Sequence, residues 1–203
     1  QALKTSPKSY RHGGRVAGLI HLWGGDTAWG GSGKMALKPF NGKLLKVQLI
    51  RYHDLDNTNT RLAQSLNEKQ GVLPPLGLGY IASSLEKAGF EVDIIDAIAL
   101  ALSKEDVAIR IKEFDPHIVG ITAMTPTIKG AFEAAEIAKN LGKITLIGGV
   151  HMSIFPLETL QRNSVDFGII GEGEESMVKF CEAVENDESY EDVEGLCYKK
   201  DGR

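Results

Sequence analysis

Short apolar runs alternate with amphipathic segments between residues 43 and 186, and this alternation constrains the fold more than any other feature of the sequence. Five runs have the length and composition of strands: Leu44–Ile50, Glu91–Ile95, Ile118–Thr122, Ile144–Ile147 and Phe167–Ile170. The segments between them predict helices. Strands that alternate with helices form a parallel sheet, because right-handed crossovers place the helices on both faces. The sequence therefore predicts an α/β fold with five parallel strands.

Two of the predicted helices carry start signals. Ser103, followed three residues later by Asp106, is typical of a capping box. Thr125 and Pro126 predict the N-cap and the first residue of the next helix.

Glycine-rich loops follow the fourth and fifth strand-like runs. The first loop is Gly148-Gly149-Val150-His151 and the second is Gly171-Glu172-Gly173-Glu174. Glycine is common in ordinary turns, so each loop alone could be a turn and nothing more. In open parallel sheets, however, ligands bind outside the carboxyl ends of the strands. The two loops together therefore indicate a ligand-binding edge, and they make His151 a better functional candidate than His117, which precedes a strand.

The composition excludes several classes of function. A net charge of -4 and a pI near 5.8 do not favour nucleic-acid binding. No apolar run approaches the roughly 20 residues that a membrane helix needs. The two cysteines, Cys181 and Cys197, are too few for a disulfide framework or a metal cluster. We therefore expect a chain that resides in the reducing cytoplasm and binds neither nucleic acid nor membrane.

The two ends of the chain differ from its centre. Residues 1–42 hold 9 of the 23 glycines and show no sustained periodicity, which predicts a poorly structured leader with Met35 as a candidate natural start. Residues 187–203 begin as an acidic stretch and are predicted to be a linker toward a missing catalytic domain. Within this linker, Gly195–Lys200 indicates the start of a further strand. The predicted cofactor domain is thus residues 43–186.

One motif suggests a different ligand. Residues Gly77 to Ala82 match G-x-G-x-x-A, the dinucleotide fingerprint, and Asp96 lies at a plausible distance beyond. That fingerprint requires its glycines directly after the first strand, so that the pyrophosphate meets a helix N-terminus. Here a long polar stretch separates Ile50 from Gly77. A nucleotide-binding or dehydrogenase-like domain using Gly77 and Gly79 therefore remains only the alternative.

A response-regulator-like signalling domain is a further alternative with the same sheet order. Such a domain needs an acidic cluster at the end of the first strand and a lysine after the fifth. Asp54 and Asp56 lie only near the first position, and Gly171 and Glu172 occupy the second. The sequence therefore disfavours this alternative.

Four segments together resemble the cobalamin-binding domain at the N-terminus of cobalamin-dependent radical S-adenosylmethionine enzymes. They read PPLGLGYIASSLEKAGFEVDIIDA, DPHIVGITAMTPTI, ITLIGGVHMSIFPLETL and DFGIIGEGEES, in the family's order and spacing. The resemblance implies a flavodoxin-like, Rossmann-like sheet of order 2-1-3-4-5. It also implies that the corrin ring of the vitamin cofactor lies over the carboxyl ends of the strands.

The resemblance also implies which residues contact the cofactor. These are the turn Pro75, Leu76 and Gly77, and three loops that follow strands: Thr122, Ala123, Met124 and Thr125; Gly148, Gly149, Val150 and His151; Gly171, Glu172, Gly173 and Glu174. No residue of the chain is predicted to be catalytic.

The chemistry of such enzymes requires parts that the family places elsewhere. A downstream barrel carries CxxxCxxC, whose three thiolates hold a four-iron four-sulfur cluster that cleaves S-adenosylmethionine. This sequence offers only Cys181 and Cys197. The resemblance thus implies an isolated cobalamin-binding module, which does no catalysis alone. Its partner would be a radical barrel in the same parent enzyme, one that resembles methyltransferases.

The lower axial ligand of cobalt is a separate question. Many cobalamin-binding domains carry D-x-H-x-x-G after the first strand, and its histidine ligates the metal. Here His53 stands at the histidine position, but Arg51 replaces the aspartate and Asp56 replaces the glycine. A ligating histidine normally needs a carboxylate or carbonyl on its second nitrogen, and an arginine cannot fill that role. We therefore expect His53 not to coordinate cobalt.

Overall fold

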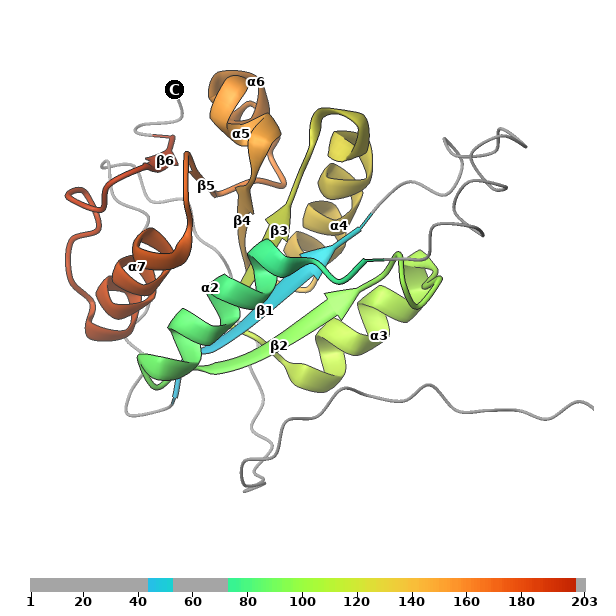
Figure 1. The fold of residues 1–203 in the computed structure, drawn as a ribbon, viewed down its shortest axis with the longest axis horizontal. Coiled ribbons are helices and arrows are strands. Elements are labelled where there is room, and N and C mark those ends of the chain that lie inside the picture. The colour runs from blue at the N-terminus through green and yellow to red at the C-terminus, as the bar shows by residue number, and fades with distance from the viewer. Residues whose placement is uncertain (1–43, 53–72, 200–203) are drawn as a thin grey trace, which may run out of the picture. The chain divides into compact units, whose positions relative to one another are not determined.

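A computed structural model of the chain describes residues 44–52 and 73–199 (Figure 1). The predicted leader at 1–42 lies outside the described residues, as do His53, Asp54 and Asp56. Among the described helices, none has the length and the apolar composition that a membrane span requires.

The strands form one six-stranded sheet in the order β2-β1-β3-β4-β5-β6. The parallel strands are β1 (Lys46–Arg51), β2 (Glu91–Asp96), β3 (Ile118–Thr122), β4 (Ile144–Gly148) and β5 (Phe167–Ile169). This confirms the predicted order 2-1-3-4-5 and the α/β fold. The prediction of five strands was incomplete, because β6 (Leu196–Tyr198) adds an antiparallel edge beside β5.

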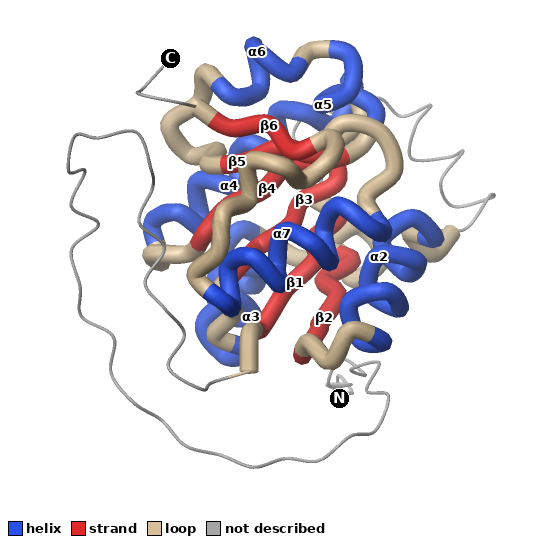
Figure 2. Tube along the Cα trace, turned by 90° about the vertical axis from the view of Figure 1, so that its left-hand side faces the viewer, coloured by secondary structure: helices blue, strands red, loops and turns tan. Residues whose placement is uncertain are grey.

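Helices cover both faces of the sheet, as expected for right-handed crossovers. On one face, α2 (Leu76–Lys87) lies beside α7 (Glu174–Asn186), as Figures 1 and 2 show. The other face carries α3 (Lys104–Phe114), α4 (Ile128–Asn140) and the two short helices α5 (Val150–Ile154) and α6 (Pro156–Leu160). The carboxyl ends of the five parallel strands thus lie at a single edge of the sheet.

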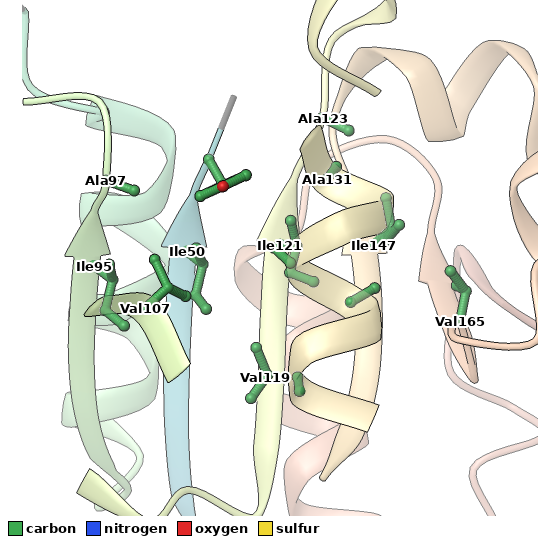
Figure 3. Close-up of a cluster of buried hydrophobic side chains, with 14 of the residues drawn as sticks. Ile50, Ile95, Ala97, Val107, Val119, Ile121, Ala123, Ala131, Ile147 and Val165 are labelled. Atoms are coloured by element: carbon green, nitrogen blue, oxygen red, sulfur yellow. The ribbon is translucent and has the colours of Figure 1, made fainter. Parts of the chain in front are cut away.

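Alternation along the strands divides the core into two clusters. In β1, Val47 and Leu49 face α2 and α7, whereas Ile50 faces the other helical layer. Figure 3 shows part of this second cluster, in which Ile50 lies beside Val107 of α3 and Ile121 lies beside Ala131 of α4. Burial on both faces of the sheet explains why the central strands β3 and β4 are nearly continuous apolar runs.

One predicted helix start is confirmed and the other is wrong. The Ser103 hydroxyl accepts a hydrogen bond from the backbone N–H of Asp106, whose carboxylate accepts one from the Ser103 N–H in return. Thr125, by contrast, does not cap α4. Residues Thr125–Thr127 form a 3-10 turn, in which the Thr127 hydroxyl oxygen accepts from the backbone N–H of Met124. Tertiary contacts engage Thr125 instead, as described below.

The prediction of a linker at 187–203 needs correction for its described part. Tyr190 packs edge-on against Phe167, with ring centroids 5.4 Å apart, and against Tyr198 of β6 at 5.1 Å. The Ser176 hydroxyl donates to the Glu194 carbonyl at 2.7 Å. The strand predicted near Gly195 is therefore present as β6, and the acidic stretch before it folds back onto the domain. Aromatic burial outweighs the polar composition of this stretch, because each large ring removes much apolar area from water.

Candidate functional site

Four strands end at the same level along the carboxyl edge of the sheet. Arg51, the last residue of β1, is in register with Asp96 on one side and with Thr122 on the other. Thr122 is in register with Gly148 at the end of β4. The predicted contact loops after β3 and β4 therefore leave the sheet side by side.

Backbone hydrogen bonds join the loops after β3 and β4. The backbone N–H of Ala123 donates to the Gly148 carbonyl at 2.9 Å, and the N–H of His151 donates to the Ala123 carbonyl at 3.1 Å. This approach requires glycine at position 149, where φ is +95° and a Cβ atom would lie 2.7 Å from the Ala123 oxygen. The sequence alone suggests that Gly149 leaves room for a ligand; in the structure, it leaves room for the neighbouring loop.

His151 holds the second contact between these loops. Its side chain is only 3% exposed, its Nδ1 lies 3.2 Å from the Thr125 hydroxyl oxygen, and its ring packs against Phe155. Its Nε2 is buried and has no partner among the described residues. Burying an N–H group without an acceptor costs more free energy than burying a nitrogen lone pair without a donor. The favoured tautomer therefore carries its proton on Nδ1 and donates it to Thr125. The Thr125 hydroxyl then keeps its own proton for another acceptor at the edge of the sheet.

Ser153 connects the loops after β4 and β5, and sequence reasoning missed it. Its hydroxyl donates to the Gly149 carbonyl at 3.3 Å and accepts from the backbone N–H of Gly171 at 3.0 Å. A single serine in an apolar segment carries no signal of this role. Only the fold brings it to both glycine loops.

The N-terminal turn of α2 completes the edge. Pro75 precedes the helix, and Leu76 and Gly77 are its first residues. Ile81, one turn after Gly77 and therefore on the same helix face, lies against Gly173, where an added Cβ would meet the Ile81 Cδ1 at 2.9 Å. Gly77 itself has nothing within 4 Å of an added Cβ. The turn thus faces the loop after β5 with open space above it.

Charged and apolar groups surround this edge. Glu172 is exposed, and Glu174 begins α7, where a negative charge interacts favourably with the helix dipole. Five apolar or aromatic side chains of this region are more than half exposed: Leu73, Leu76, Tyr80, Met124 and Val150. The edge thus offers exposed apolar side chains beside backbone and hydroxyl groups, the mixture typical of sites for small molecules.

The structure separates other candidates from this edge. Within residues 44–52 and 73–199, no group of three or more His, Cys, Asp or Glu side chains could hold a metal ion. His117 lies at the opposite edge, where its Nδ1 accepts from the backbone N–H of Lys46. Burial raises the pKa of the Cys181 thiol far above its ordinary value, so this cysteine is not a reactive nucleophile.

The dinucleotide alternative is not favoured. Gly77 and Gly79 lie within α2 itself, and β1 ends at Arg51, far earlier in the chain. The fingerprint would place its glycines in the turn that joins the first strand directly to its helix. The match to G-x-G-x-x-A is therefore coincidental in this fold.

Comparisons with known proteins point to one family and one fold. The B12 binding domain family matches residues 66–180. An uncharacterised methyltransferase of Pyrococcus horikoshii is 38% identical over 133 residues, which cover 64% of this chain and 29% of that protein. A cytidylyl-2-hydroxyethylphosphonate methyltransferase of Streptomyces wedmorensis is 31% identical over 151 residues, covering 64% of this chain and 28% of that protein. The chain therefore spans less than a third of the length of these relatives.

Solved structures share the fold at lower identity. The radical S-adenosylmethionine methyltransferase TsrM from Kitasatospora setae, with cobalamin and a [4Fe-4S] cluster bound, superposes with a TM-score of 0.58 at 20% identity over 77% of this chain and 27% of that one. The cobalamin-dependent radical enzyme OxsB, with aqua-cobalamin and S-adenosylmethionine bound, superposes with a TM-score of 0.63 at 19% identity over 77% of this chain and 21% of that one.

Proposed function

This chain belongs to the B12-binding domain family, and from that premise we propose that the carboxyl edge of its sheet holds the corrin ring of cobalamin. The observation that carries the proposal is the family match over residues 66–180, which includes the α2 turn and the three loops that follow β3, β4 and β5. Hydrogen bonds and side-chain contacts join these four segments into one continuous surface.

The residues at this edge fit a large, flat and partly apolar ligand. Leu76, Met124 and Val150 expose apolar area that a corrin ring would cover, and the open space at Gly77 lets a ring approach the helix. The amide substituents of a corrin need polar partners. The Thr125 hydroxyl, oriented by His151, supports the assignment as one such donor.

Residues of the loops themselves keep the site in shape for the ligand. The Ala123–His151 and Ser153–Gly171 hydrogen bonds keep three loops in place before the ligand arrives, which lowers the entropic cost of binding. When bound, cobalamin supplies a cobalt centre that can carry an alkyl group. The remaining assigned contacts, from Pro75 to Glu174, stay predictions until a complex is measured.

We further propose that the chain is the cobalamin-binding module of a longer radical S-adenosylmethionine enzyme that acts as a methyltransferase. The relatives support this, since two are named methyltransferases and each is more than three times as long as the region matched. S-adenosylmethionine and a four-iron cluster would then bind in a barrel elsewhere in the parent protein. Two free cysteines support a reducing, cytoplasmic setting.

Cobalamin retention tests the first proposal. The full chain, mixed with hydroxocobalamin and desalted, should stay coloured at micromolar concentration. Gly77→Leu should release the cofactor, because the new side chain enters the open space above the α2 turn. Gly79→Leu is the matched control, since Gly79 also has nothing within 4 Å of an added Cβ but lies about 200° further around the helix.

One outcome would contradict cobalamin binding, and two others would contradict the role assigned to Gly77. A colourless wild-type chain with an intact circular-dichroism spectrum excludes cobalamin binding. Equal retention by both leucine variants removes Gly77 from the site, and equal loss shows that the two substitutions act through α2 itself. The proposal that the four-iron cluster binds elsewhere in the parent protein has its own test. Anaerobic reconstitution with iron and sulfide should yield no stoichiometric four-iron cluster on this chain, and a cluster that cleaves S-adenosylmethionine would overturn it.

A further inference from the structure

Arg51 ends β1 at the candidate edge and uses its guanidinium to join three separate segments. Its Nε donates to Asp96 Oδ1 at 2.9 Å, and its Nη2 donates to Asp96 Oδ2 at 2.7 Å. Its Nη1 donates to the Leu73 carbonyl at 2.9 Å. The side chains of Arg51 and Asp96 are only 21% and 17% exposed, so solvent screens this pair less than an ordinary surface ion pair.

Asp96 extends the same network into the turn after β2. Its Oδ1 also accepts from the backbone N–H of Ala99 at 3.1 Å, and the Ala97 N–H donates to the Arg51 carbonyl at 2.9 Å. Asp96 therefore fixes the plane of the guanidinium from one side. In this orientation Nη1 lies within hydrogen-bond distance of the Leu73 carbonyl.

The position of Leu73 determines where α2 begins. Pro74 and Pro75 follow it directly, and proline restricts φ both at its own position and in the residue before it. The chain between the Leu73 carbonyl and the first residue of α2, Leu76, is therefore short and stiff. We therefore expect a displacement of the Leu73 carbonyl to shift Leu76 and Gly77 as well.

We propose that Arg51 is a positioning residue for the cofactor: it holds the Leu73 carbonyl and thereby sets the position of Leu76 and Gly77 over the ends of the strands. This inference rests on the proposed function. It assigns a role to the arginine that stands where many cobalamin-binding domains have an aspartate. Arginine suits this role because its planar fork can bind a carboxylate with two donors and still offer a third.

Arg51→Lys is the first test. Lysine keeps the positive charge but cannot make two parallel bonds to Asp96 and a third to Leu73. We expect the variant to fold, with an unchanged circular-dichroism spectrum. We expect its Kd for hydroxocobalamin to rise about tenfold, which corresponds to about 1.4 kcal/mol.

A charge swap separates positioning from simple stabilisation. In Arg51→Asp/Asp96→Arg the ion pair is restored across β1 and β2, but the residue at the end of β1 no longer has a donor for the Leu73 carbonyl. We expect the midpoint of urea unfolding to recover toward the wild-type value while cobalamin affinity stays low. Recovery of both quantities together would show that Arg51 acts only through stability, and would overturn the inference.

Hydrogen exchange provides a measurement that needs no ligand. The Gly79 N–H donates to the Pro75 carbonyl in the first turn of α2, so this amide reports on the start of the helix. In Arg51→Lys, exchange in a peptide covering residues 73–80 should become faster, and exchange in one covering 144–148 should not change. Unchanged exchange in both would overturn the inference.

The binding results distinguish this inference from the proposed function. A wild-type chain that binds no hydroxocobalamin contradicts the proposed function and the cofactor role of Arg51 with it. A wild-type chain that binds, together with an Arg51→Lys variant of equal Kd, contradicts the inference alone.

Discussion

Replacing Gly149 by alanine should destabilise the fold itself, before any effect on a ligand. Gly149 has φ +95° and ψ -174°, a backbone region that is essentially restricted to glycine. An added Cβ would lie 2.7 Å from the Ala123 carbonyl oxygen and 3.1 Å from the Ala123 nitrogen, both of them backbone atoms that cannot rotate away. To relieve the contact, the loops after β3 and β4 must separate.

The magnitude follows from two terms. The backbone strain costs about 1–3 kcal/mol. Separation of the loops also weakens the hydrogen bond from the His151 N–H to the Ala123 carbonyl, which contributes about 0.5–1.5 kcal/mol. The sum, about 1.5–4.5 kcal/mol, is a large fraction of the 5–15 kcal/mol by which folded domains are typically stable.

Urea unfolding followed by circular dichroism measures this loss, and Gly171→Ala is the matched control. Gly171 also has a positive φ, +80°, but an added Cβ there meets nothing within 4 Å. Its substitution should therefore cost only about 1–2 kcal/mol of backbone strain. Both changes stiffen the unfolded chain equally, so that contribution cancels in the comparison. If Gly149→Ala costs no more than Gly171→Ala, the close approach of the two loops is not what stabilises this edge.

Three further predictions concern other parts of the chain. Iodoacetamide at pH 8 should alkylate Cys197 before Cys181, because Cys181 is fully buried and burial raises its thiol pKa far more; mass spectrometry of the labelled peptides decides this. Hydrogen bonds from Ser103 lower the pKa of Asp106 below its ordinary 3.8, so the carboxylate stabilises the fold above that pH, and this contribution disappears as pH falls through the lowered value. In Asp106→Asn, the free energy of unfolding should therefore fall less steeply with pH in the acid range, and an unchanged slope contradicts this. His53 should not ligate cobalt, so the electron paramagnetic resonance spectrum of bound Co(II) should lack splitting from an axial nitrogen, and splitting that disappears in His53→Ala would prove the opposite.

The sequence predicted the sheet because its signals are local. Central strands such as Ile118–Thr122 are buried on both faces and are therefore almost entirely apolar, and helices with a 3.6-residue apolar period separate the strands. The Ser103–Asp106 capping box was equally readable, since both partners lie within one turn. Signals of this kind depend only on residues close together in the sequence, so they can be recognised without the tertiary structure.

Predictions failed where a distant partner outweighed a local preference. Threonine is a preferred N-cap residue, but the Thr125 hydroxyl lies beside His151 and a 3-10 turn precedes α4. The stretch around Tyr190 is acidic and reads as solvated, yet its ring packs against Phe167 and the chain returns to form β6. In both cases the competing contact spans more than twenty residues of sequence.

The sequence by itself determined the order of the elements, the two-sided burial of the sheet and the glycines that mark its carboxyl edge. The tertiary structure alone decided how that edge is held together. Ser153 joins two loops, Ile81 lies against Gly173, and Arg51 reaches both Asp96 and Leu73. The physical reason is that periodicity records only which face of an element is buried. Contacts between loops depend instead on strand register and crossover geometry, which bring residues together without leaving a pattern in the chain.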